Sequence, residues 1–277
     1  MRTVVVSNGK RAIVWLLAVM VVVATLGVGW AANPHQPRSG SVAAATDDAN
    51  VTVEERRGSY VISQTGDEPA SVGLVFYPGG HVDPEAYVPV LAPYAAETGV
   101  RVYVPKMPFT LSVLDPDRAG VFREQAPEIR TWYVGGHSLG GSMACQYASN
   151  NPERVDGVVL AGSYCEQSIN GTDLSALQVL GSRDGVVTSA ESTATDRNLP
   201  ENATVITLEG VNHTQFGSYT GQADDLPANV SYEVAHERIR RVLWAWSAAR
   251  SDDIDAPENG TLAPESEDDS SGLSGLE

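Results

Sequence analysis

The chain has 277 residues, of which 42% are hydrophobic and 19% are charged, so it can bury a hydrophobic core of ordinary size. Its formal net charge is −17, from 35 acidic and 18 basic residues. This charge argues against a nucleic-acid partner, because no clustered basic stripe is present to neutralise phosphates. Lys10 and Lys106 are the only lysines. Such an acid-rich, lysine-poor composition resembles that of proteins that work in high salt, which screens the repulsion between like charges.

An uncharged segment of 21 residues, 12–32, follows Lys10 and Arg11. As a helix it would be about 30 Å long, which matches the hydrocarbon core of a bilayer. We expect an uncleaved transmembrane anchor, because the apolar core of a signal peptide is usually only about 7–15 residues long. A cleaved signal peptide, and hence a secreted protein, is the alternative. The positive charges before the segment predict that residues 1–11 are cytoplasmic and that the chain after residue 32 is extracytoplasmic.

The rest of the chain divides into three parts by composition. Residues 33–50 are small and polar and include proline and glycine, which predicts a flexible stalk. Residues 51–250 carry the apolar runs and are expected to form one domain. Residues 251–277 contain acidic but no basic residues, and we expect an acidic, disordered tail because the segment has too little apolar surface to bury.

Six short apolar runs have the length and composition of buried strands: 72–77, 100–105, 131–135, 157–161, 177–180 and 204–208. Helical patterns lie between and after them. One begins with the capping residue Asp83 and Pro84 and continues to about Thr98, and another covers 231–249. This alternation predicts an α/β fold, with a mostly parallel sheet covered by helices on both faces. Ligands of such sheets bind beyond the carboxyl ends of the strands.

The loop after the run 131–135 contains the pattern G-x-S-x-G, as Gly136-His137-Ser138-Leu139-Gly140. Glycines on both sides allow a sharp turn from strand to helix, which exposes the serine hydroxyl above the sheet. The same turn points the N-terminus of the next helix at a reacting carbonyl. Ser138 is therefore the candidate nucleophile.

A serine hydroxyl needs a base to accept its proton and an acid to orient that base. Asp184 follows the run 177–180, and His213 follows the run 204–208. Both residues would lie at the carboxyl ends of their strands, beside Ser138. We therefore expect Ser138, Asp184 and His213 to form a catalytic triad.

Acyl transfer also needs two backbone N–H groups directed at the oxygen that becomes negative. Leu139 supplies the first by its position after the serine. The second is expected from the Pro-Gly-Gly-His loop after the run 72–77, with Gly80 as the preferred donor and Gly79 or His81 as alternatives. His81 and His137 are candidate pocket residues.

Five motifs occur in a fixed order: residues 76–87 (FYPGGHVDPEAY), 104–108 (VPKMP), 135–141 (GGHSLGG), 181–185 (GSRDG) and 212–217 (NHTQFG). Together they resemble the α/β-hydrolase fold-5 family, relatives of dienelactone hydrolases and small carboxylesterases. The resemblance covers about residues 55–248 and implies a Ser-Asp-His hydrolase with the triad at Ser138, Asp184 and His213. Dienelactone hydrolases use a cysteine nucleophile where this chain has serine, so their butenolide chemistry is not implied.

Two further expectations concern the surroundings of the site. Only about residues 162–176 separate two predicted strands, which leaves no room for a large lid domain and suits small or solvent-exposed esters. Cys145 and Cys165 are expected to be separate buried thiols, although a disulfide is allowed outside the cytoplasm. The spacings C-x-x-C and H-E-x-x-H do not occur, so no metal and no cofactor is expected.

The sequence thus predicts a membrane-anchored, extracytoplasmic serine hydrolase that cleaves a carboxylic ester or thioester through an acyl-enzyme. Its expected partners are a small-molecule ester and the membrane. Acyl transfer to another acceptor would use the same residues and is one alternative. A non-catalytic envelope binding protein is another, because a fold does not determine a function.

Overall fold

The computed structural model describes residues 33–47, 50–56, 58–66 and 69–256, together with Leu16, Met20 and Gly29. Residues 1–11, nearly all of the predicted anchor 12–32 and the predicted tail after residue 256 lie outside the described residues. Among those described, no helix has both the length and the hydropathy needed to cross a membrane. The membrane anchor therefore stays a prediction.

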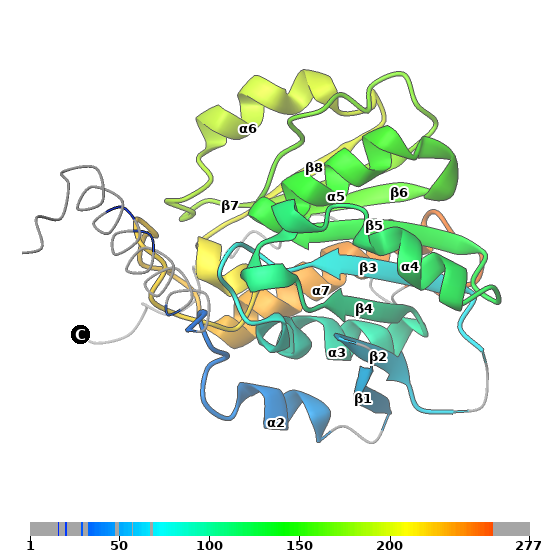
Figure 1. Ribbon diagram of the computed structural model, residues 1–277, viewed down its shortest axis with the longest axis horizontal. Coiled ribbons are helices and arrows are strands. Elements are labelled where there is room, and N and C mark those ends of the chain that lie inside the picture. The colour runs from blue at the N-terminus through cyan, green and yellow to red at the C-terminus, as the bar shows by residue number, and fades with distance from the viewer. Residues whose placement is uncertain are drawn as a thin grey trace, which may run out of the picture.

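Within the described residues, eight strands form one sheet in the order β1-β2-β4-β3-β5-β6-β7-β8 (Figure 1). The strands are β1 (Val51–Arg56), β2 (Ser59–Gln64), β3 (Val72–Tyr77), β4 (Arg101–Pro105), β5 (Thr131–His137), β6 (Gly157–Ala161), β7 (Ser175–Gly181) and β8 (Thr204–Leu208). β2 pairs antiparallel with β1 and β4, and the other neighbours are parallel. The six predicted strands are all present. β1 and β2 were missed because their side chains are mostly half-exposed at the sheet edge, so their sequences carry no continuous apolar run.

Helices cover both faces of the sheet, which confirms the predicted α/β class. The α-helices are α2 (Ser41–Thr46), α3 (Val88–Thr98), α4 (Arg118–Gln125), α5 (Leu139–Asn150), α6 (Ser189–Thr195) and α7 (Tyr232–Ala248). The 3-10 helices are η1 (Pro84–Tyr87), η2 (Pro108–Thr110), η3 (Ser112–Leu114), η4 (Pro152–Arg154), η5 (Asp196–Asn198) and η6 (His213–Phe216). The helix predicted from residue 83 starts as η1, where the Asp83 carboxylate accepts the N–H of Glu85, and continues as α3.

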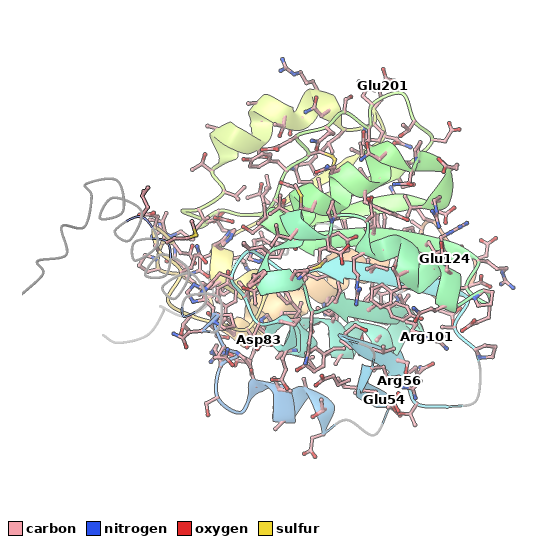
Figure 2. The ribbon with its side chains drawn as sticks, viewed as in Figure 1. Glu54, Arg56, Asp83, Arg101, Glu124 and Glu201 are labelled. Carbon is pink, nitrogen blue, oxygen red and sulfur yellow. A yellow bond between two sulfur atoms is a disulfide. The ribbon has the colours of Figure 1, made fainter. Side chains whose placement is uncertain are left out.

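Alternation along the buried strands builds a core on each face of the sheet. Leu74 and Phe76 of β3 join the core with α3 and α7, whereas Val75 and Tyr77 join the core with α4 and α5. Every residue of β3 is buried, as expected for a central parallel strand. Charged side chains such as Glu124 and Glu201, labelled in Figure 2, lie at the periphery. The carboxyl ends of the parallel strands thus rest on a rigid, two-sided support.

The connection from β6 to β7 comprises residues 162–174, all of which are described, and no helix occurs in it. It is too short to form a lid domain over the carboxyl ends of the strands. The expected absence of a large lid in this connection is therefore confirmed.

Two predicted segment boundaries are corrected. The expected flexible stalk is packed over its residues 33–46: His35 forms a parallel bridge with Val82, and α2 packs against α3. A segment of small polar residues can be either flexible or held in place by backbone hydrogen bonds. Composition does not distinguish the two, because backbone groups are the same in every sequence. At the other end, Ile254 is buried and Asp253 forms an ion pair with Arg130 at 2.9 Å, so residues 251–256 belong to the fold.

Cys145 of α5 and Cys165 after β6 form a disulfide, with their Cα atoms 5.5 Å apart. The expectation of separate thiols is therefore wrong. Sequence alone does not show that the chain after β6 folds back along α5, where the Ser142 hydroxyl donates to the carbonyl of Tyr164 at 3.1 Å. The bond ties the helix that begins at the candidate nucleophile to the neighbouring loop.

Candidate active site

Ser138 lies at the sharp turn between β5 and α5. Its φ of 53° and ψ of −127° form a conformation that a non-glycine residue adopts only when the surroundings impose it. A side chain at Gly136 would meet backbone atoms of Gly140 at 2.5 Å, and one at Gly140 would overlap the carbonyl oxygen of Tyr77. The turn therefore requires both glycines of the motif, and it leaves Ser138 partly exposed at the carboxyl end of β5.

Asp184 and His213 come from adjacent strands, because Asp184 follows β7 and His213 follows β8. Oδ2 of Asp184 lies 2.8 Å from Nδ1 of His213, and each side chain is only 1% exposed. The other carboxylate oxygen accepts the N–H groups of Val186 and Val187 at 2.9 and 2.7 Å. These bonds fix the carboxylate, which in turn orients the imidazole so that Nε2 is left to act as a base.

Asp225 is a residue of the site that the sequence did not reveal. Its Oδ1 accepts the N–H of His213 at 3.0 Å and that of Gly185 at 3.4 Å, and its Oδ2 accepts the N–H of Thr214 at 3.0 Å. One carboxylate therefore joins the loop of Asp184 to the loop of His213. Asp225 lies in an irregular loop without a motif, so no signal in the sequence singled it out.

The loop after β3 approaches the N-terminus of α5, as the oxyanion-hole prediction requires. A side chain at Gly80 would meet Leu139 at 3.2 Å, so these two residues are neighbours. The N–H of Gly79 donates to the Tyr87 hydroxyl, and the N–H of His81 donates to a backbone carbonyl. Within the described residues, the N–H groups of Gly80 and Leu139 make no such bond. Of the three candidates in the loop, Gly80 therefore keeps the free donor.

His137 was a candidate pocket residue, and the structure buries it completely beside His213. The two imidazole rings have their centroids 4.3 Å apart. Nδ1 of His137 is hydrogen-bonded to the Tyr87 hydroxyl at 2.9 Å, and this hydroxyl also accepts the N–H of Gly79 at 2.8 Å. Burial, aided by the charge of His213, lowers the pKa of His137 well below its usual value. His137 is therefore a neutral ring that packs against the candidate base.

His81, the other candidate pocket residue, follows Gly80 and is half-buried with a left-handed φ of 60°. Its ring packs edge-on against His35, with the centroids 5.7 Å apart. Burial, together with His35, lowers the pKa of His81. His35 belongs to the segment that was predicted to be a flexible stalk, so its position here is a further correction.

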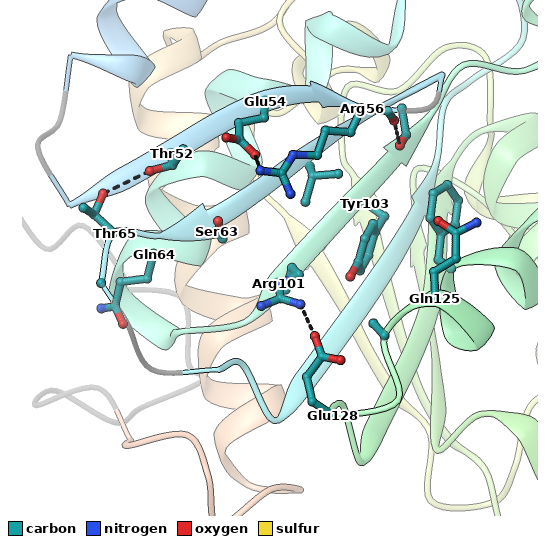
Figure 3. Close-up of a pocket in the computed structure, with 15 residues that line it drawn as sticks. Thr52, Glu54, Arg56, Ser63, Gln64, Thr65, Arg101, Tyr103, Gln125 and Glu128 are labelled. Carbon is teal, nitrogen blue, oxygen red and sulfur yellow. Dashed lines mark hydrogen bonds and ion pairs between the residues drawn. The ribbon is translucent and has the colours of Figure 1, made fainter.

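A separate pocket of about 550 Å³ lies on the open face of β1, β2 and β4 (Figure 3). Two ion pairs line it, Arg56 with Glu54 and Arg101 with Glu128, each at 2.5 Å. None of the candidate site residues contributes to its wall. Because its arginines are already paired with carboxylates, this pocket carries no functional assignment.

Residues 73–237 match the model of the alpha/beta hydrolase family. No curated protein matches the chain. Among solved structures, a predicted CIB-like hydrolase from Thermoplasma acidophilum is 19% identical, with a TM-score of 0.50, and the match covers 70% of this chain and 98% of that one. Est1E from Butyrivibrio proteoclasticus is 12% identical, with a TM-score of 0.50 and coverage of 72% and 100%. At these identities the two structures show a shared fold. Since the family model spans more than half of the chain, the protein belongs to the α/β-hydrolase family and is a hydrolase.

Proposed function

We propose that the protein is a serine hydrolase that cleaves a carboxylic ester or thioester of a small molecule. Ser138 is the proposed nucleophile, His213 the base and Asp184 the acid that orients the base. The proposal rests on the buried Asp184–His213 hydrogen bond, which lies at the same edge of the sheet as the strained turn of Ser138. Membership of the hydrolase family supports it.

The proposed reaction begins when Nε2 of His213 accepts the hydroxyl proton of Ser138 and the serine oxygen bonds to the substrate's carbonyl carbon. The N–H groups of Gly80 and Leu139 are the proposed donors to the oxygen that becomes negative. The imidazolium then gives its proton to the leaving alcohol or thiol as the bond from that group to the carbonyl carbon breaks. His213 then takes a proton from water, whose oxygen bonds to the acyl carbon. As the bond from that carbon to the Ser138 oxygen breaks, the imidazolium returns the proton to the serine oxygen and the acid is released.

We also propose that residues 12–32 anchor the enzyme in a membrane, with the hydrolase domain outside the cytoplasm. The uncharged segment behind Lys10 and Arg11 supports the anchor and its orientation. The disulfide between Cys145 and Cys165 supports the location independently, because such bonds persist mainly in oxidising compartments.

The test is covalent labelling of the full chain, in detergent, with a fluorophosphonate probe at low and at high salt. We expect labelling of the wild type, none of Ser138→Ala, and a loss on the order of 10³-fold or more in His213→Ala. Hydrolysis of short-chain esters is measured in parallel. A folded wild-type chain that is not labelled at any salt concentration would refute the serine mechanism and favour a binding protein.

A further inference from the structure

Residues 33–40, which we call the N-terminal strap, lie outside the region that matches the family model. In Figure 1 the blue segment that leads to α2 runs beside the yellow loop that follows β8. This position was not expected for a stalk. The contacts of the strap show that it touches two loops of the proposed active site at once.

The first loop is the one that carries Gly80. The N–H of His35 donates to the carbonyl of His81 at 2.9 Å, and the N–H of Asp83 donates to the carbonyl of His35 at 2.9 Å. The backbone N–H and carbonyl of His35 are thus bonded to His81 and Asp83, which lie shortly after Gly80 in the chain. Through these bonds the strap forms a short parallel bridge with the loop, in which His35 pairs with Val82.

The second loop is the one that follows His213. The N–H of Arg38 donates to the carbonyl of Ser218 at 2.7 Å. Nδ1 of His35 lies 3.1 Å from the carbonyl oxygen of Thr220, and the His35 ring packs against Tyr219 with the centroids 5.4 Å apart. His35 therefore contacts both loops, through its backbone on one side and its ring on the other.

A side-chain path continues from the strap toward the candidate base. The Arg38 guanidinium lies 3.9 Å from the centroid of the Tyr232 ring. The Tyr232 hydroxyl donates to the Thr214 side-chain oxygen at 3.1 Å, and Thr214 is the neighbour of His213. Arg38 also approaches Glu233 at 4.0 Å, but the Glu233 side chain is 78% exposed and this ion pair contributes little.

The two loops do not follow neighbouring strands, because β5, β6 and β7 lie between β3 and β8. Within the described part of the chain, one backbone hydrogen bond joins them directly, from the N–H of Ser218 to the carbonyl of Ala86 at 2.7 Å. In the proposed function an oxyanion donor from the first loop and a base from the second must act on one substrate carbonyl. An error of about 1 Å in such a placement can cost on the order of 10²-fold in rate.

We propose that the N-terminal strap is a positioning element of the active site, with His35 as its central positioning residue. It holds the loop of Gly80 and the loop of His213 in the relative position that acylation of Ser138 requires. This inference rests on the proposed function and adds to it a segment that the hydrolase family model does not include.

The test uses the full chain with His35→Pro, which removes the N–H donor to His81 and the ring contacts to the second loop. The control is Ser39→Pro. Ser39 precedes Gly40 in a tight turn closed by the bond from Ser41 to Arg38, and Gly40 has the φ of 78° and ψ of −11° of the third residue of a type II turn. Proline is common at the position of Ser39 in such a turn. This control adds the same residue to the strap without removing a contact.

We expect His35→Pro to lower kcat and the rate of probe labelling by about tenfold, with KM within about twofold of the wild type, and Ser39→Pro to change neither. Titration of the active sites with the probe gives the rate per competent site. A variant that is only destabilised would show fewer sites with a normal rate at each. Equal rates per site for the two proline variants would overturn the positioning role.

If His35→Pro does not fold, His35→Ala serves as the second variant, because it keeps both backbone bonds and loses only the ring contacts. We expect its rate per site to fall about threefold, whereas Gln36→Ala, at an exposed position of the same strap, leaves the rate unchanged. Equal rates for these two alanine variants would likewise overturn the proposal. A folded wild-type chain without labelling would instead refute the proposed function, so the two failures are distinguishable.

Discussion

Single carboxylates decide how well the candidate base is held. Asp184 binds the His213 ring, whereas Asp225 binds the His213 backbone and reaches the loop of Asp184. The two acids therefore perform different tasks although they lie close together. One orients the imidazole, and the other holds the backbone to which the imidazole is attached.

We predict that Asp225→Asn lowers kcat by about 10- to 100-fold. The amide keeps only one acceptor oxygen, and its NH2 group would face a backbone N–H, so the carboxylate's bonds to His213, Gly185 and Thr214 cannot all be kept and the loop of His213 shifts. Asp224→Asn is the matched control, since Asp224 is exposed and asparagine tolerates its φ of 65°. Steady-state kinetics with a short-chain ester measure both. A loss of activity in Asp224→Asn as large as that in Asp225→Asn would contradict the assigned role.

The buried, neutral His137 predicts a pH dependence of stability. Its pKa is lowered well below 6.5 in the folded state, so the unfolded chain takes up more protons as the pH falls below about 6.5. The free energy of unfolding should therefore fall as the medium is acidified. We predict that the decrease in Tm from pH 7.5 to pH 5 is smaller for His137→Gln than for the wild type. The prediction concerns this decrease and not the Tm at either pH.

Thermal unfolding followed by circular dichroism at several pH values measures this difference. The same measurement on His236→Gln compares the effect of a second histidine, His236 in α7, whose pKa is also lowered by burial. An unchanged pH dependence in His137→Gln would show that His137 does not carry the effect.

At the scale of elements, the turn of Ser138 is supported from both sides. The glycines of the motif let β5 and α5 meet, and the disulfide ties α5 to the loop after β6. The strap then joins two loops that the sheet leaves apart. The glycine turn, the disulfide and the strap thus join elements around the candidate site.

We predict that replacing both cysteines, Cys145→Ser and Cys165→Ser, lowers the free energy of unfolding by about 3 kcal/mol, because the bond closes a loop with a sequence separation of 20 residues. For a domain of this size the loss corresponds to a decrease in Tm of about 6–12 °C. Calorimetry of the double variant, with the oxidised wild type beside it, measures the change. A Tm equal to that of the wild type would argue against a stabilising disulfide.

For the whole molecule, the net charge and the proposed anchor lead to expectations about salt and about the membrane. With a net charge of −17, the acidic side chains repel one another at low salt, and added salt screens this repulsion. The labelling experiment therefore compares low with high salt. Asn33, the residue after the predicted anchor, begins the strap beside the proposed active site. An anchored enzyme would therefore hold its site close to the membrane surface.

We predict that the full chain sediments with membranes and resists extraction by alkaline carbonate, because residues 12–32 are uncharged over the thickness of a bilayer. Deletion of residues 12–32 should release the protein. In intact cells or spheroplasts, added protease should reach the hydrolase domain. Complete recovery of the full chain in the soluble fraction would contradict the anchor and favour a cleaved signal peptide.

From local patterns alone, the sequence predicted the class of fold and the candidate residues Ser138, Asp184 and His213. Central parallel strands are buried on both faces, so they require continuous apolar runs, and the sharp turn at the serine requires glycines at set positions. These are local requirements, and a single sequence displays them. The edge strand β1 and its neighbour β2 are mostly half-exposed and lack such a requirement, which is why the sequence did not reveal them.

Tertiary contacts were needed to place Asp225 and His35 beside the candidate site and to pair Cys145 with Cys165. Each depends on a contact between segments that are distant in the chain: the bond from His35 to Thr220 spans 185 residues. Composition describes a segment but not its neighbours, so a polar strap and a flexible stalk look alike in the sequence. What distinguishes them is the set of backbone hydrogen bonds that the folded loops offer, and those exist only once the sheet has brought the loops together.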